Sequence, residues 1–440
     1  MDGTAATPED DDRAAATPDQ PVRGTERLVT LDFIRGIAVV GILFANITAF
    51  GHPMVAYYWP GALPDGGNEA DRWVWLFQFV LIDGKFRTLF TLLFGAGMYL
   101  FTERAWARGS GEGLQFRRLV LLLAFGAAHF FFLFIGDILF LYALSGFAAL
   151  LLLNWGARQQ FWTGLIWYLV GTLAFTVALA SAAAMEASPA VQAQAGEAWA
   201  QMEGAWQGQL TEAEGEREVI SRGNYGDIVA YRFTEQRGRL AENMFIAAFE
   251  TIPLMLIGMA LYRFGFFAGG FSRRKMQAWG WIGFVGGGIA SLAMGWLVVE
   301  RGFPPYLTQL MFNGLSGFPR IAMALGMAAL LVLWAPRAGQ GWLGSRFVAA
   351  GRMAFSNYVG TSVVMLFVFQ GWAGGLYGEL HRLDLLAIAA GGWLLMLAWS
   401  KPWLERFRYG PLEWLWRCLT YGKLFPLSRR VELDTATHSH

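Results

Sequence analysis

Ten long apolar segments restrict how this 440-residue chain can fold more than any other feature. Most of them reach the length of roughly 18 residues that an α-helix needs to cross the hydrocarbon core of a bilayer. Backbone polar groups cannot stay unpaired in hydrocarbon, so we expect an all-α polytopic membrane protein with about ten transmembrane helices. The segments lie at residues 31–51, 78–102, 117–135, 138–153, 160–183, 241–264, 276–298, 308–334, 350–370 and 384–400.

The composition agrees with a chain whose main partner is the lipid bilayer. Hydrophobic residues make up 55% of the chain and charged residues 15%, well away from soluble averages. The net charge of +1 gives no reason to expect a nucleic-acid partner. The single cysteine, Cys418, excludes an intrachain disulfide and a cysteine-based metal cluster, and we expect no metal.

Composition along the chain predicts five regions. Residues 1–24 are acidic, rich in Ala, Pro and Thr, and without apolar periodicity, which predicts a disordered tail rather than a cleavable signal peptide. Two membrane bundles of five spans each follow at 25–183 and 241–425, and the second precedes a tail at 426–440. An extracytoplasmic segment at 184–240 separates the bundles.

The distribution of basic residues predicts that both termini are cytoplasmic. Cytoplasmic loops carry an excess of Lys and Arg, whereas long translocated loops are largely insensitive to charge. The basic residues assigned to the inside are Arg104, Arg108, Arg117, Arg118, Arg263, Arg273, Arg274, Lys275, Arg337, Arg346, Lys401, Arg406, Arg408, Arg417, Lys423, Arg429 and Arg430.

The 184–240 segment contains the spacing of an amphipathic helix. Trp199, Met202, Trp206 and Leu210 recur at helical intervals among polar residues. Such a helix can cover the mouth of a chamber in the bundle, lie on the outer membrane surface, or serve as a solvated connector.

Ionisable and polar residues at one depth of the predicted spans indicate a polar chamber. A charged group inside a bilayer costs several kcal/mol and therefore usually faces a bundle interior or a watery cavity. On the predicted topology these residues lie toward the external side: Asn46, His52, Asp83, Lys85, Arg87, His129, Asp137, Glu250 and Arg320.

Plain structural roles are open to the same residues. Asp32 and Arg35 are three residues apart, on one helical face, and can pair with each other. His52 can be an exposed turn residue. His129 can be held by Asp137 or a carbonyl, and Glu250 with Arg320 can form an ion pair between helices.

Five motifs carry a resemblance to a known family. They are RLVTLDFIRGIAVVGILFAN at 27–46, DGKFRTLFTLLFGAG at 83–97, RLVLLLAFGAAH at 118–129, GDILFLYALSG at 136–146 and GRMAFSNY at 351–358. Over residues 27–425 the chain resembles the YeiB family of bacterial inner-membrane proteins, whose C-terminal half is the DUF418 domain. The resemblance implies a multi-pass protein of the bacterial inner membrane.

The first motif is also similar to the opening of heparan-α-glucosaminide N-acetyltransferase and, more distantly, of acyltransferase-3 enzymes. These relatives imply transfer of an acyl group from cytoplasmic acyl-CoA, with acetyl-CoA the first expectation, to an acceptor outside. Heparan-α-glucosaminide N-acetyltransferase is a lysosomal enzyme, and the resemblance implies that its asparagine, catalytic histidine and aspartate correspond to Asn46, His52 and Asp83. In acyltransferase-3 enzymes the catalytic histidine stands where this chain has Asn46, so that histidine has no counterpart here.

The residues also permit this chemistry on physical grounds. Acyl transfer needs a base of near-neutral pKa, which His52 or His129 can supply, oriented by Asp83 or Asp137. Asn46 can donate to a developing oxyanion. Arginines bind phosphate well, and the candidates for the donor's phosphates are Arg35, Arg117, Arg118, Arg346 and Arg352. Lys85, Glu250 and Arg320 are expected in the substrate pocket.

Two other classes of function stay open at this point. A transporter or flippase of a small acidic or amphipathic solute can use Glu250, Arg320 and the histidines as a proton-coupled pathway. A non-catalytic membrane scaffold is the third class. The sequence leaves open the acyl chain, the acceptor, the oligomeric state and whether the protein is an enzyme.

Overall fold

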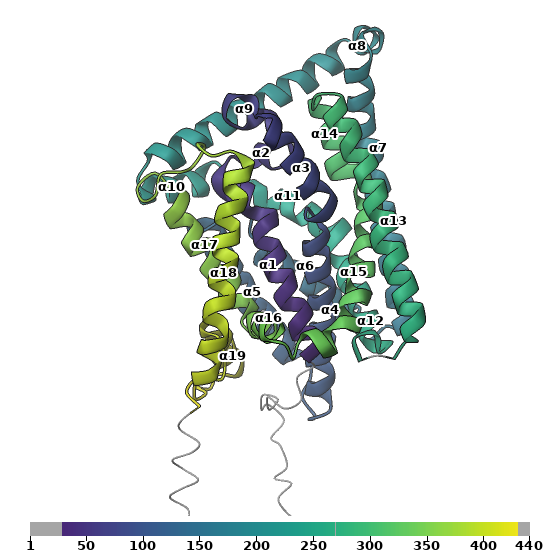
Figure 1. Ribbon diagram of the computed structural model, residues 1–440, viewed down its shortest axis with the longest axis vertical. Coiled ribbons are helices and arrows are strands. Elements are labelled where there is room, and N and C mark those ends of the chain that lie inside the picture. Colours follow the sequence, from purple (N-terminus) through teal and green to yellow (C-terminus); the bar gives the residue numbers. More distant parts are fainter. Residues whose placement is uncertain (1–28, 269, 430–440) are drawn as a thin grey trace, which may run out of the picture.

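Every regular element in the described part of the chain is a helix (Figure 1). The computed structural model describes residues 29–268 and 270–429, so the predicted disordered tail at 1–24 and the last part of the 426–440 tail lie outside the described residues. The expected all-α fold is confirmed within these ranges.

The longer helices of the bundle correspond to the apolar segments. They are α1 (Val29–Gly51), α4 (Lys85–Trp106), α5 (Gly113–Phe132), α6 (Leu139–Leu151), α7 (Ala157–Ala187), α12 (Ile252–Arg263), α13 (Arg273–Glu300), α15 (Gly317–Ala338), α17 (Ala354–Phe369) and α18 (Arg382–Arg406). Connecting and capping helices are α2 (Met54–Tyr58), η2 (Pro60–Ala62), η3 (Pro64–Gly66), α3 (Glu69–Leu81), α8 (Pro189–Ala195), α9 (Glu197–Arg222), α10 (Tyr225–Thr234), α11 (Arg239–Ile246), π-helical η4 (Ala247–Thr251), η5 (Phe266–Ala268), α14 (Pro305–Gln309), π-helical η6 (Leu310–Leu315), α16 (Trp342–Arg352) and α19 (Pro411–Tyr421).

Seven helices in the described ranges are long and apolar enough to cross a membrane, and α16 with α17 makes an eighth candidate. The outer faces of α7 and α13 are strongly apolar: Ile166, Val170 and Val177 on α7 and Ile282 and Ile289 on α13 are exposed. A helix face of this kind is stable against lipid rather than water. The set of helices indicates a multi-pass membrane protein.

Several of the ten predicted spans differ from uniform apolar helices. The 241–264 and 308–334 spans contain the π-helical segments η4 and η6. Helix α4 carries Lys85, Arg87, Glu103 and Arg104 near its two ends. Helix α6 has 13 residues, which gives it a length of about 20 Å. The predicted 350–370 span is bent by 86° between α16 and α17.

The bend between α16 and α17 is held by a residue far away in the sequence. The carboxylate of Glu413 on α19 accepts hydrogen bonds from the backbone N–H groups of Phe355 (2.8 Å) and Ser356 (3.1 Å), and from the Ser356 hydroxyl. It therefore satisfies first-turn N–H groups that a continuous helix would pair with preceding carbonyls. Burial raises the pKa of the Glu413 carboxyl, and these donors oppose that shift.

Helix α1 lies inside the bundle, against α4, α15, α16, α17 and α18. Its contact with α16 is made backbone to backbone, because a Cβ atom added at Gly351 would lie 1.8 Å from the Asp32 carbonyl oxygen. Small residues permit this approach between membrane helices. The contact brings the Arg35 end of α1 and Arg352 at the end of α16 into one wall.

Helices α8, α9 and α10 lie across the end of the bundle opposite the described chain ends (Figure 1). The predicted apolar face of α9 packs on that end: Trp206 is buried, its ring centroid 5.0 Å from that of Trp59, and the Tyr306 hydroxyl donates to the Met202 carbonyl at 2.9 Å. The structure contains the predicted helix, with its apolar face packed on the end of the bundle.

A buried carboxylate fixes α9 to the bundle. Glu216 accepts hydrogen bonds from the Tyr377 hydroxyl (2.9 Å) and from the Gln236 amide (3.1 Å). Burial raises the pKa of Glu216, while the nearby Arg239 guanidinium opposes the shift.

Candidate active site

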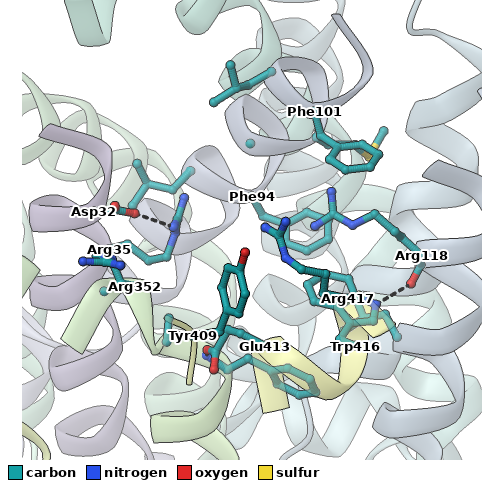
Figure 2. A pocket seen from close by; sticks show the side chains of 18 of the residues that line it. Asp32, Arg35, Phe94, Phe101, Arg118, Arg352, Tyr409, Glu413, Trp416 and Arg417 are labelled. Atoms are coloured by element: carbon teal, nitrogen blue, oxygen red, sulfur yellow. Dashed lines mark hydrogen bonds and ion pairs between the residues drawn. The ribbon is translucent and has the colours of Figure 1, made fainter. Parts of the chain in front are cut away.

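A cavity of about 1330 Å³ lies at the end of the bundle where the described chain begins and ends (Figure 2). Its walls come from the start of α1, the second half of α4, the first half of α5, the start of α6, the junction of α16 and α17, and α19 with its flanking loops. Ligand pockets usually measure about 300–1,000 Å³. This cavity therefore has room for a ligand of cofactor size.

Positive charge dominates the cavity wall. Eight cationic side chains and only two carboxylates line it. Figure 2 shows Arg35 and Arg352 on one wall, and Arg118 and Arg417 on the facing wall. The cations are Arg35, Arg104, Arg118, Arg352, Arg408, Arg417, Lys423 and Arg429, and the carboxylates are Asp32 and Glu413. Such an excess of guanidinium groups favours anions with several oxygen atoms.

Aromatic rings hold some of these cations in place. The Arg118 guanidinium lies 3.9 Å from the Phe101 ring centroid and 4.5 Å from that of Trp416. Arg417 lies 4.5 Å from the Tyr409 ring centroid, and the Tyr409 side chain stands between the two walls in Figure 2. Cation–π contacts hold these guanidinium groups in position on the cavity wall.

Tyr142 and Tyr358 belong to the part of the cavity formed by α6 and α17. The Tyr142 hydroxyl is 2.8 Å from the Thr91 hydroxyl, and the Tyr358 hydroxyl accepts a hydrogen bond from the Ile138 N–H at 3.2 Å. The ring of Tyr358 also contacts His129, with 5.0 Å between the centroids. Tyr358 is therefore a wall shared by the cavity and this buried histidine.

His129, Asp137 and Ser362 form a fully buried cluster behind Tyr358. The Asp137 Oδ1 atom lies 2.8 Å from His129 Nδ1, and Ser362 Oγ lies 2.8 Å from His129 Nε2. The carboxylate approaches the ring off the N–H axis, so this is a close polar contact rather than a linear hydrogen bond. The other Asp137 oxygen accepts from the Phe140 N–H at 2.6 Å. The predicted His129–Asp137 contact is confirmed.

The structure separates the other predicted catalytic residues from this cluster. His52 is buried after α1, with Nε2 2.7 Å from the Leu380 carbonyl oxygen, so it is not an exposed turn residue. Asp83 is buried in the break between α3 and α4, where its carboxylate interacts electrostatically with the positive charges of Arg382, Lys85 and Arg320. Asn46 is half-buried on α1. None of the five predicted catalytic residues lines the large cavity.

The predicted donor-binding arginines divide into two groups. Arg35, Arg118 and Arg352 line the cavity, and Arg35 donates to Asp32 at 2.9 Å as its spacing predicted. Arg117 is exposed on α5, outside the cavity wall. Arg346 donates to the Leu397 carbonyl at 3.0 Å and also lies outside the wall.

Arg87, Glu250 and Arg320 form a second charged group within the bundle. Arg87 donates to both Glu250 oxygens at 2.8 and 2.9 Å, and Arg320 approaches one of them at 3.5 Å. The predicted Glu250–Arg320 contact is confirmed, with Arg87 as the nearer partner. Lys85 lies buried at the start of α4, where its ammonium donates to the Phe79 carbonyl. These residues do not line the large cavity.

Comparison with known proteins identifies the family. Residues 261–423 match the family described as "Protein of unknown function (DUF418)". The uncharacterized protein YeiB of Escherichia coli strain K12 is 32% identical over 408 residues, which are 90% of this chain and 96% of YeiB. The chain belongs to the YeiB/DUF418 family. The uncharacterized protein YxaH of Bacillus subtilis strain 168 is 29% identical over 434 residues, which are 94% of this chain and 99% of YxaH. No solved structure matches the chain.

The DUF418 region supplies only part of the cavity of this family member. It contains Arg352, Tyr409, Glu413 and Arg417, while α1, α4 and α5 supply the facing residues. In the described ranges no group of three or more His, Cys, Asp or Glu side chains could hold a metal ion. The structure thus offers a cationic cavity and, behind Tyr358, a histidine with a carboxylate and a hydroxyl.

Sequence reasoning missed several residues of this site. Ser362 gave no signal because it lies 233 residues from His129 in the chain. Arg408, Arg417 and Lys423 were recognised as basic residues of the inside face, but nothing in their spacing indicated that α19 folds back over the cavity. Tyr142 and Tyr358 lie within the family motifs at 136–146 and 351–358.

Proposed function

We propose that the chain crosses the bacterial inner membrane about ten times, with both termini in the cytoplasm. The supporting observations are that the described ends lie at one end of the bundle (Figure 1) and that the basic loops are at that end. Helix α4 joins the apolar spans because its charged residues lie near its ends, with a mostly apolar stretch between them. The cationic cavity then opens toward the cytoplasm.

Thiol labelling in intact cells tests this orientation. In a Cys418→Ala background, Glu218→Cys on the exposed face of α9 is expected to react with an impermeant reagent before lysis. The matched variant Ala107→Cys, exposed between α4 and α5, is expected to react only after lysis. Reaction of Ala107→Cys in intact cells together with protection of Glu218→Cys would reverse the orientation.

We propose that the protein is a membrane acyltransferase whose donor is a cytoplasmic acyl-CoA, with acetyl-CoA the first to test. One observation carries this proposal: a cationic cavity of cofactor size shares Tyr358 with a buried His129–Asp137 pair. The phosphates and nucleotide of the carrier would meet the arginines, and the aromatic rings offer stacking surfaces. The thioester would extend toward Tyr142 and Tyr358.

His129 is the proposed base in this reaction. An imidazole with a carboxylate at Nδ1 keeps Nε2 available to take a proton from an attacking group. Asp137 stabilises the imidazolium that forms, because it lies 2.8 Å away and is itself buried. The acceptor, an amine or a hydroxyl, would approach from the external side. In this arrangement His129 replaces His52 as the preferred catalytic histidine.

Donor binding is tested with Arg118 and its neighbour Arg117. Purified protein is incubated with labelled acetyl-CoA, and consumption of the thioester is measured. Arg118→Gln and Arg417→Gln are each expected to raise KM about tenfold, since a charge-assisted hydrogen bond contributes about 1.5–3 kcal/mol. Arg117→Gln is the matched control and is expected to keep the KM of the unaltered protein. If all three variants keep the KM of the unaltered protein, this cavity is not the donor site.

A second candidate function is transport of a small acidic or amphipathic solute. Three helix irregularities surround the Arg87–Glu250–Arg320 group: Gly84 has a φ of 74°, Glu250 lies in π-helical η4, and Arg320 donates to the Phe312 carbonyl of π-helical η6 at 3.2 Å. Discontinuous helices of this kind hold substrate and ions in transporters. Purified protein that leaves acyl-CoA intact but moves an acidic solute across vesicles would favour this function.

A further inference from the structure

The buried cluster behind Tyr358 has the connectivity of a hydrolase triad, drawn from three separate segments. Asp137 in the loop between α5 and α6 contacts His129 Nδ1, and Ser362 on α17 contacts His129 Nε2, both at 2.8 Å. All three side chains are at most 4% exposed. A carboxylate beside Nδ1 favours the tautomer that carries its proton there, and Nε2 can then accept the serine proton.

The hydroxyl of Ser362 has two acceptors within reach. Its Oγ lies 2.8 Å from His129 Nε2 and 3.3 Å from the Tyr358 carbonyl oxygen. A serine inside a helix commonly donates to the carbonyl four residues earlier. In the tautomer with its proton on Nδ1, the imidazole is the nearer acceptor, and the hydroxyl is then placed to lose its proton to His129.

The cluster also lies between two cavities. Ile138, Tyr142 and Tyr358 line the large cytoplasmic cavity, whereas Phe134 and Met365 line a small cavity of about 30 Å³ under α9. His129, Asp137 and Ser362 fall between these residues along the same helices. Tyr358 therefore stands between this group and the large cavity, and Glu216 and Ile220 of α9 line the small cavity on its other side.

We infer that Ser362 is a nucleophile that carries the acyl group between the two sides, an inference that rests on the proposed acyltransferase function. In the first step Ser362 Oγ attacks the thioester carbonyl, and His129 takes the hydroxyl proton. The carbon–sulfur bond breaks, and the thiolate leaves with the proton from His129. In the second step the external amine or hydroxyl attacks the serine ester and loses its proton to His129, and the Ser362 alkoxide leaves and recovers that proton.

This relay explains why donor and acceptor need not meet. The acyl group waits as a serine ester after the thiol has left, so one cavity can close before the other opens. A direct transfer would require both substrates to reach His129 at the same time, through a septum that is closed on both sides in this structure. The covalent step is also the feature that distinguishes the inference from the proposed function.

The test uses full-length purified protein and two labels. An alkyl fluorophosphonate reacts with activated serines whatever the natural donor is, and labelled acetyl-CoA reports the natural step. Both are expected to modify the peptide that contains Ser362, with an acetyl ester that resists neutral hydroxylamine. Ser362→Ala and His129→Ala are expected to lose both labels. Thr361→Ala, whose hydroxyl donates to the Asn357 carbonyl at 2.7 Å, is the matched control and should keep them.

A cysteine variant keeps the test decisive if Ser362→Ala fails to fold. Ser362→Cys is expected to accept the acetyl group as a thioester that neutral hydroxylamine removes. Acetyl-CoA turnover by Ser362→Ala at the wild-type rate, or a serine label outside residue 362, would overturn the relay and leave the acyltransferase function in place. Fluorophosphonate labelling of Ser362 without any use of acyl-CoA would support the activated serine and overturn the proposed donor. Absence of both labels from residue 362 in the unaltered protein would overturn the relay.

Discussion

His129→Ala is expected to lower the rate of acyl transfer by at least about a hundredfold, because general acid–base catalysis contributes about 10²–10⁴-fold. Donor binding should change little, since His129 does not line the cationic cavity. The decrease should therefore appear in kcat and not in KM. The measurement is thioester consumption over a range of acetyl-CoA concentrations, with gel filtration as the check on folding.

His52→Ala is the matched control for this experiment. His52 is also a buried histidine, but its Nε2 contacts the Leu380 carbonyl rather than Asp137 or Ser362. Its replacement is expected to loosen the segment around Leu380 and to leave kcat near that of the unaltered protein. If His52→Ala loses turnover and His129→Ala keeps it, the assignment based on the lysosomal acetyltransferase resemblance is right, and the geometric one is wrong.

The sequence contained enough information for the pairs that are close along the chain. Asp32 and Arg35 lie one helical turn apart, and His129 and Asp137 flank one turn between two helices, so spacing alone brings them together. The Glu250–Arg320 contact was also predicted, from equal depth in two spans. The contact between Arg87 and Glu250 was not predicted, because the depth of a residue in the membrane does not specify which helices are neighbours.

The cavity itself could not be predicted from the sequence. It exists because α17 starts after an 86° bend that Glu413 of α19 stabilises, and because α19 and the loop before it bring Arg417 and Tyr409 opposite Arg35. Glu413 lies 58 residues from Phe355, and Arg35 lies at the other end of the chain, so no local pattern encodes these contacts. The basic residues near the C-terminus predicted only on which side of the membrane this segment lies. Their charge does not specify which helices they contact.

Removing the Glu250 charge should have the largest effect on stability. Glu250→Gln leaves the Arg87 and Arg320 guanidinium groups inside the bundle without their shared carboxylate. Breaking a fully buried ion pair costs about 3–5 kcal/mol, and we expect a smaller loss here because the Arg87 and Glu250 side chains are 32% and 20% exposed. The unfolding temperature in detergent is therefore expected to fall by several degrees or more. Arg320 keeps its bonds to Ser316 and Phe312, so the helix itself should stay intact.

Glu218→Gln on α9 is the matched control, because its ion pair with Arg222 is exposed, with 71% of the Glu218 side chain open to solvent. An exposed pair contributes only about 0–1 kcal/mol, so the unfolding temperature should stay nearly constant. A Glu250→Gln protein as stable as the control would mean that the two arginines are compensated by something other than Glu250. Together with loss of solute movement, that result would favour a role of the Arg87–Glu250–Arg320 group in transport, since a variant of unchanged stability would have lost function without losing its fold.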